Sequence, residues 1–313
     1  MIVPNETPRP TFRQRLNDSD LWLSFKAAPV TIAAAAVTVL IIMLALFAPL
    51  IAPQNAFDPA ALNLLDGFAH PMERGAGSNR LFLLGADAQG RDMLSALFYG
   101  TRVSLLVGIC SVAFSMTLGI SLGLIAGYLG GRIELVIMRI ADIQLSFPAI
   151  LIALLVFGVA RGLIPPNQHE TTALFVIIFA IGLSHWAQYA RTVRASALVE
   201  RNKDYVQAAR LIGIKGLPIM AKHILPNVMG PVMVIATINL ALAVIEEATL
   251  SFFGVGMPVT QPSLGTLIRF GQQYLISGEW WILLFPALTI VILGLAINLL
   301  GDWLRDALNP KLR

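Results

Sequence analysis

The order of apolar and charged positions divides the chain into long uncharged runs separated by shorter charged segments. Six runs approach the ~20 mostly apolar residues that a helix needs to cross a membrane. They cover residues 30–52, 103–131, 143–160 with a start near 135, 171–190, 223–245 and 280–301. Because irregular backbone cannot face lipid, each run predicts one spanning helix. The expected fold class is an all-α integral membrane protein with six transmembrane helices.

A seventh uncharged run, residues 248–268, differs from the other six in composition. It contains Gly254, Gly256, Pro258 and Gly265, which break helices and mark turns. We therefore expect an outer loop here rather than a seventh span, with a re-entrant loop as the open alternative.

The overall composition excludes a soluble fold. Apolar residues make up 57% of the chain and charged residues 13%, half of the ~25% usual for soluble domains. The same apolar content excludes intrinsic disorder. The sequence has one cysteine, Cys110, which excludes a disulfide scaffold and a multi-cysteine metal site.

Basic residues are distributed unequally among the segments between the runs. With the N-terminus inside, 16 of the 22 lysines and arginines fall on the cytoplasmic side. The positive-inside rule then places both termini in the cytoplasm. The net charge of +4 is therefore explained by basic residues that orient the chain in the membrane. We expect membrane lipid as a partner, and no nucleic acid. Residues 1–27 and the long first run do not fit a secretory signal, and a cleaved signal is the weaker alternative.

Two segments between the runs are long enough to have structure of their own. The periplasmic loop 53–102 ends in a stretch whose Met93, Leu94, Leu97 and Phe98 share one helical face. This pattern indicates an interfacial helix along the membrane or, equally, a helix that contacts a partner. The expected organisation is a cytoplasmic segment 1–27, a first span 28–52, the periplasmic loop 53–102, a five-span core 103–305 that includes a cytoplasmic loop 191–228, and a cytoplasmic tail 306–313.

The cytoplasmic loop 191–228 carries the signals of two short helices. Asp204 is a capping residue with Gln207 three positions later, as in a capping box. Gly213 stands where a left-handed residue ends a helix. A second short helix is expected over residues 219–224.

The first of these helices has small side chains on one face, at Ala208 and Ala209. A small-residue face lets another surface approach closely. Because an isolated helix of this length is marginal in water, it must pack on this chain or dock on a cytoplasmic partner.

Polar side chains inside the spans are functional candidates, since a charge at the bilayer centre costs at least ~2.5 kcal/mol. Glu246 and Glu247 lie toward the outer end of the fifth run. They either line a translocation path or reach outer water from a helix end, and the second interpretation is slightly favoured. His185 and Asn239 are expected to form hydrogen bonds between helices. All four are candidates for the path.

Two further patterns predict packing within the membrane. Asp142 and Arg139 have the i, i+3 spacing of a local ion pair. Gly119, Gly123 and Gly127 form a stripe of small residues on the second run, which allows close helix approach. The stripe is expected to pack spans tightly, within this chain or against a partner.

No pattern for ATP hydrolysis or other catalysis occurs in the sequence. Residues 213–216 lack the Gly-Lys-Ser/Thr ending of a phosphate-binding loop, and Gly-x-Ser-x-Gly is absent. The pair His169-Glu170 is not followed by the second histidine of a zinc-binding helix. We expect no catalytic residue, no metal site and no enzymatic activity in this chain.

Four stretches together resemble the membrane subunits of bacterial ATP-binding-cassette importers, specifically the second permease of the dipeptide/oligopeptide (peptide/nickel) family. They occur in order and at the family's spacing over nearly the whole chain from Leu21. Three are residues 84–105, 250–256 and 298–313. The fourth is the loop signature Gln207-Ala208-Ala209, then Gly213, then His223-Ile224-Leu225-Pro226.

Some positions depart from the family pattern. Gln207 replaces a glutamate, so a salt bridge there is lost or becomes a neutral hydrogen bond. His223 replaces an isoleucine, Ala86 a threonine, Ala96 an arginine and Asn309 an aspartate. None of these changes removes the resemblance.

The resemblance implies a type I importer fold in the bacterial inner membrane, with a loop that couples to a cytoplasmic ATPase. Ala208, Ala209 and Gly213 would lie in a groove of that ATPase. The implied coupling residues are Asp204, Tyr205, Gln207, Ala208, Ala209, Arg210, Gly213, Leu225 and Pro226.

The implied partners are a homologous second permease, two ATP-binding subunits and a periplasmic or extracellular solute-binding protein. This chain would hold no cofactor, because ATP and Mg are bound by the ATPase subunits. The expected solutes are di- and oligopeptides, with nickel or a sugar as alternatives. A self-sufficient ion-coupled transporter is the other class to weigh, but the chain has no convincing inverted repeat.

Overall fold

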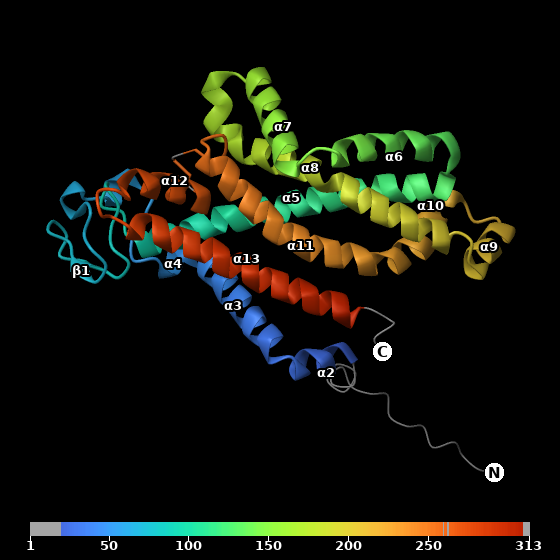
Figure 1. Ribbon diagram of the computed structural model, residues 1–313, viewed down its shortest axis with the longest axis horizontal. Helices are drawn as coiled ribbons and strands as arrows, with labels where there is room; N and C mark the ends of the chain where they lie inside the picture. The colour runs from blue at the N-terminus through green and yellow to red at the C-terminus, as the bar shows by residue number, and fades with distance from the viewer. Residues whose placement is uncertain (1–19, 259, 262, 309–313) are drawn as a thin grey trace, which may run out of the picture.

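The apolar runs form an elongated helical bundle in the computed structural model of the chain, which describes residues 20–258, 260–261 and 263–308. Strands β1 (Glu73–Arg74) and β2 (Leu81–Phe82) lie at one end of the bundle, and the short helix α9 (Asp204–Leu211) lies at the other (Figure 1). Of the expected terminal segments, residues 1–19 and 309–313 fall outside the described residues.

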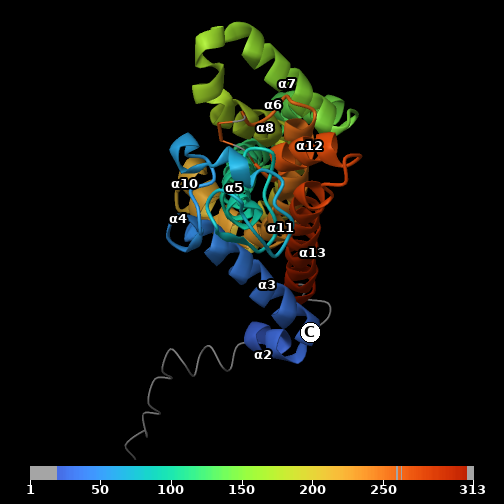
Figure 2. The same ribbon diagram turned by 90° about the vertical axis from the view of Figure 1, so that its left-hand side faces the viewer.

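Five helices of the described chain are long and apolar enough to cross a membrane, and one bent pair makes a sixth if it is a single span. The single helices are α3 (Pro29–Leu46), α5 (Met93–Leu129), α8 (His169–Glu200), α11 (Leu225–Phe252) and α13 (Trp281–Ala307). The bent pair is α6 (Gly131–Leu145) and α7 (Ala149–Leu163). Viewed along the bundle, α5 lies in the middle (Figure 2).

The remaining elements are short. They are α2 (Asp20–Ala27), α4 (Ala48–Ile51), α10 (Gly216–Pro218) and α12 (Leu264–Tyr274), the 3-10 turns η1 (Pro59–Ala61), η2 (Leu64–Asp66) and η3 (Pro166–Gln168), and the π-helical segment η4 (Ile219–Ile224).

The loop between α4 and α5 is an ordered unit built around Asp66. Its carboxylate accepts hydrogen bonds from the backbone N–H groups of Gly77 (2.7 Å) and Ser78 (3.1 Å). Burial acts to raise the pKa of Asp66, but hydrogen bonds from Ser78 and Gly77 outweigh it and hold the pKa below its usual value. The loop is joined to α13 because the Trp281 indole N–H donates to the carbonyl of Ala86 at 3.1 Å.

The end of this loop differs from the prediction of an interfacial helix. Residues from Met93 onward are the first turns of α5, and the Asp92 side chain caps the helix by accepting from the N–H of Ser95. Met93 and Leu97 are buried against protein. The apolar face found in the sequence therefore packs on the bundle, and the loop ends ten residues earlier than expected.

The third span is not one straight helix. Helices α6 and α7 are bent by 100° at the break around Pro148. Proline has no backbone N–H, and it biases the preceding residue, Phe147, away from the helical region. The sequence run had suggested a helix continuing through this position.

The fifth span extends beyond its predicted end, and the seventh uncharged run is divided between elements. Helix α11 continues to Phe252, so Glu246 and Glu247 lie inside the helix. A loop follows, and Ser263 then caps α12, whose 11 residues are too few to cross a membrane. The prediction that no seventh span exists here is confirmed.

The glycine stripe packs helix α5 onto helix α8 of the same chain. A Cβ atom added at Gly123 would lie 2.6 Å from the carbonyl oxygen of Ala190 and 2.8 Å from the Cβ of Val193. Equivalent clashes occur one turn away at Gly119 and Gly127, against Tyr189 and Ala197. The predicted close approach of two helices is therefore confirmed, and both helices belong to this chain.

Two ion pairs join α6 to α8. Asp142 pairs with Arg191, and Glu134 pairs with Arg194. The predicted local pair between Asp142 and Arg139 is wrong, because the Asp142 carboxylate faces α8 rather than its own helix.

Replacing Gly123 by Leu should prevent α5 and α8 from packing. Overpacking usually costs about 1–3 kcal/mol, and here the obstacle is backbone, which cannot move aside as a side chain can. We expect a lower thermal unfolding midpoint and a lower yield of folded protein in detergent.

Gly158 on α7 provides the matched control, since a Cβ there would meet nothing within 4 Å. Gly158→Leu should leave the unfolding midpoint close to that of the wild type. Equal midpoints for the two leucine variants would contradict the assigned packing.

Candidate functional site

The loop between α8 and α11 emerges from the end of the bundle opposite the β strands (Figure 1). Three residues separate the last residue of α8, Glu200, from the first residue of α9, and α10 and η4 then lead directly into α11. The loop is thus a direct continuation of two long helices.

The end of α9 has the geometry that its glycine predicts. Gly213 has a left-handed φ of 82°. Its N–H donates to the carbonyl of Arg210, and the N–H of Ile214 donates to the carbonyl of Ala209, both at 3.0 Å. These two bonds form a Schellman motif, which ends the helix sharply.

The start of α9 differs from the predicted capping box. Lys203 is the N-cap and Asp204 is the first helical residue, with no side-chain capping bond. The Lys203 ammonium instead lies 2.6 Å from the Glu200 carboxylate. The Gln207 amide reaches the carbonyl of Arg201 at 3.4 Å, so the neutral hydrogen bond expected for this substitution is made within the loop.

Tyr205 joins the loop to both long helices. Its hydroxyl donates to the Glu200 carboxylate at 2.5 Å and accepts from the Asn227 amide at 3.1 Å. Burial, together with the adjacent Glu200 carboxylate, raises the pKa of the Tyr205 phenol, so it remains a donor. The predicted coupling residue Tyr205 therefore connects the end of α8, the start of α9 and the start of α11.

The two alanines of the loop signature differ in exposure. Ala209 is buried with Val206 in a cluster that includes Ile219, Ile224 and Val228. Ala208 is exposed. The expectation that both alanines lie in a partner's groove stays a prediction, and in this structure the side chain of Ala209 is covered by η4 and α11.

The solvent-exposed surface of the loop carries large apolar side chains that the sequence did not predict as a contact surface. Leu211 is 88% exposed, Ile212 76% and Leu217 73%. The sequence did contain a signal for this exposed surface. Apolar residues stand next to the helix-ending Gly213 in a loop that is otherwise charged. Gln207, Ala208 and Arg210 are exposed beside them, and Arg210 lies over the Tyr128 ring at 5.0 Å.

The last two predicted coupling residues begin α11. Leu225 is its first residue, and Pro226 follows in the first turn, where proline loses no helical hydrogen bond. Leu225 packs against the cluster around Ala209, while Pro226 is exposed. These residues therefore fix where α11 begins.

The four intramembrane polar candidates do not form one cluster. His185 on α8 lies 2.9 Å from the Glu246 carboxylate on α11, which confirms the predicted bond between helices for the histidine. Although it is paired with His185, the Glu246 carboxylate remains partly exposed. Asn239 is buried on α11, and its amide nitrogen has no hydrogen-bond partner among the described residues.

Glu247 is fully buried, so the interpretation that it reaches outer water is wrong. Its carboxylate accepts hydrogen bonds from the hydroxyls of Ser104 (2.6 Å) and Ser251 (2.7 Å). Ser104 also accepts from the N–H of Leu264 at the start of α12. Glu247 therefore joins α5, α11 and α12 near the start of α12.

The fold and this loop define a class: a multi-pass helical membrane protein whose two long helices meet in a compact helical loop. Residues 119–313 match the family of binding-protein-dependent transport system inner membrane components, and the chain belongs to that family. It is therefore a multi-pass inner membrane protein and the permease subunit of an ATP-binding-cassette importer, rather than a self-sufficient ion-coupled transporter.

Curated relatives cover almost the whole chain. The Di/tripeptide transport system permease protein DppC of Pseudomonas aeruginosa is 38% identical over 94% of this chain and 92% of its own length. The Oligopeptide transport system permease protein OppC of Bacillus subtilis is 34% identical over 94% and 90%. These proteins belong to the family that the four sequence stretches resemble.

The fold is shared with a solved transporter structure. A chain of the MetNI methionine ABC transporter aligns with a TM-score of 0.52 at 22% identity, covering 69% of this chain and 98% of that chain. The likeness supports the type I importer fold for the helical core.

Removing the Glu247 carboxylate should loosen the outer end of the bundle. Glu247→Ala leaves the hydroxyls of Ser104 and Ser251 without their shared acceptor, at about 1–3 kcal/mol for each unsatisfied buried group. We expect a clearly lower thermal unfolding midpoint. Glu247→Gln keeps one acceptor and the side-chain volume, so its midpoint should lie between those of Glu247→Ala and the wild type. An alanine variant as stable as the wild type would contradict this role.

Proposed function

We propose that this chain is the second permease of an importer of di- and oligopeptides, and that it forms the translocation path with a homologous permease. The support is the similarity, over more than nine-tenths of the chain, to permeases named for di/tripeptide and oligopeptide transport. In this proposal a solute-binding protein delivers the peptide at the outer end of the bundle.

The loop 191–228 is the proposed docking site for cytoplasmic ATP-binding subunits, which supply the ATP and Mg that this chain does not bind. Leu211, Ile212 and Leu217 carry the proposal, because three large apolar side chains exposed outside the membrane favour a protein partner. The contact face is this apolar edge with Ala208, rather than the buried face of Ala209.

The proposed orientation places this loop and both termini in the cytoplasm. The excess of lysine and arginine on that side supports it. Helices α8 and α11 would then carry motion of the loop into the membrane through Tyr205 and its bonds to Glu200 and Asn227.

Glu246 is the proposed path residue among the four candidates. It is the one whose carboxylate is both inside the span and partly open, while His185 holds it in place. A partly exposed carboxylate at this depth requires a polar surrounding. The charged amino end of a peptide would supply an attractive partner.

Docking is tested by Leu211→Asp in the complete transporter. Burying a leucine contributes about 1.5–3 kcal/mol, so a charge in its place should lower the affinity for the ATPase subunits at least tenfold. We expect loss of ATPase co-purification and of peptide uptake, with the permease still in the membrane.

Leu64→Asp is the matched control, since Leu64 is 76% exposed on the outer loop. It should retain ATPase binding. Full co-purification with the Leu211→Asp variant would refute docking at this face.

Glu246→Gln tests the path. Glutamine keeps the volume and a bond to His185 but removes the charge, and a charge-assisted hydrogen bond contributes roughly 1.5 kcal/mol or more. Peptide uptake should fall about tenfold with unchanged assembly and ATPase binding, whereas Glu170→Gln at the start of α8 should transport normally. Wild-type uptake by Glu246→Gln would exclude it from the path.

A further inference from the structure

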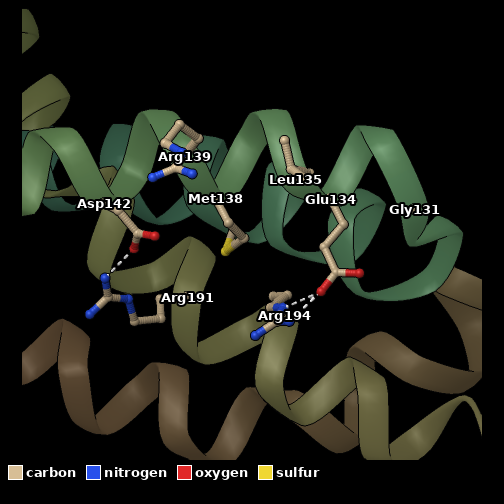
Figure 3. A pocket seen from close by; sticks show the side chains of 8 residues that line it. All are labelled: Gly131, Glu134, Leu135, Met138, Arg139, Asp142, Arg191 and Arg194. Atoms are coloured by element: carbon tan, nitrogen blue, oxygen red, sulfur yellow. Dashed lines mark hydrogen bonds and ion pairs between the residues drawn. The ribbon is translucent and has the colours of Figure 1, made fainter.

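A groove of about 570 Å³ lies between α6 and α8, on the part of both helices nearest to the coupling loop. Its charged lining consists of Arg139, Arg191, Arg194, Glu134 and Asp142. Figure 3 shows the two ion pairs that bridge the helices, Asp142 with Arg191 and Glu134 with Arg194. The two helices that form the groove are therefore joined by ion pairs at two positions along their length.

The balance of charge in this groove is positive. Three guanidinium groups face two carboxylates, and both carboxylates are already paired. Arg139 is exposed, and it has no hydrogen bond or ion pair with any residue that the structure describes. Its five N–H donors are available in a planar fork, the arrangement that suits a phosphate group.

The surface around the groove is apolar. Leu135 is 64% exposed and Ile143 is 56% exposed, and they flank Arg139 on the same helix. An arginine between exposed aliphatic side chains is arranged for the boundary between hydrocarbon and headgroups, where the apolar groups meet acyl chains and the guanidinium meets the polar layer.

We propose that this groove binds the phosphate headgroup of an anionic phospholipid. The Arg139 guanidinium contacts the phosphate, and the free edge of Arg191 supports it. The acyl chains lie against Leu135 and Ile143. Basic pockets between spanning helices on the cytoplasmic side are the usual receptors for such headgroups.

The chemistry of the groove favours a lipid over a soluble anion. A free phosphate would use the guanidinium groups but would leave the exposed leucine and isoleucine uncovered. A lipid satisfies both surfaces at once. A bound headgroup would add a third bridge between α6 and α8, close to where α8 enters the coupling loop at Glu200.

The test is native mass spectrometry of the intact transporter in detergent with added phosphatidylglycerol or, separately, phosphatidylcholine. Wild type should retain more phosphatidylglycerol. One basic residue near a lipid surface contributes ~1 kcal/mol, so Arg139→Gln should lower phosphatidylglycerol retention about fivefold. Arg139→Lys, which keeps the charge, should retain most of the binding.

Arg132→Gln is the matched control, because Arg132 is exposed on the same helix and does not line the groove. It should bind lipid as the wild type does. Equal retention by Arg139→Gln and wild type would overturn the proposal, as would displacement of the lipid by glycerol phosphate or inorganic phosphate. Crosslinking of a cysteine at position 139 to the second permease would overturn it too, since the groove would then be a subunit interface.

Discussion

The close approach of α5 and α8 is the constraint on which the rest of the structure depends. At three positions of α5 spaced about one turn apart, Gly119, Gly123 and Gly127, the neighbouring helix leaves room for a hydrogen atom but for no side chain. Dispersion contacts between such surfaces are the main source of helix association in lipid, where burial of apolar groups supplies no driving force. The other spanning helices pack around this pair.

The same pair determines where the loop between α8 and α11 is held. Helix α8 continues past the glycine contacts to Glu200, whose carboxylate binds both Lys203 and Tyr205. The loop is consequently attached to a helix that cannot shift relative to α5 without separating closely packed backbones. An ATPase docked at the exposed apolar edge, as proposed, would therefore act on a rigid unit.

Several charged groups of the bundle are paired with a neighbouring helix. Glu247 is surrounded by hydroxyls, Glu246 faces His185, and the arginines of α8 meet the carboxylates of α6. Because an unpaired charge in lipid is costly, these contacts connect α5, α6, α8 and α11 into one polar framework. Within the part of the chain that the structure describes, the Glu246 carboxylate stays partly exposed and the Arg139 guanidinium has no ion pair, so the proposed ligands are placed at these two groups.

The sequence by itself determined the membrane class, the number of apolar runs, the glycine stripe and the end of α9 at Gly213. These depend on local properties, namely the length of an apolar run, the absence of a side chain and the backbone freedom of glycine. Only the tertiary structure decided that Ala209 is buried, that Asp142 pairs with Arg191, and that Glu247 is enclosed. Each of these depends on which helix lies opposite, and residue spacing along one helix does not contain that information.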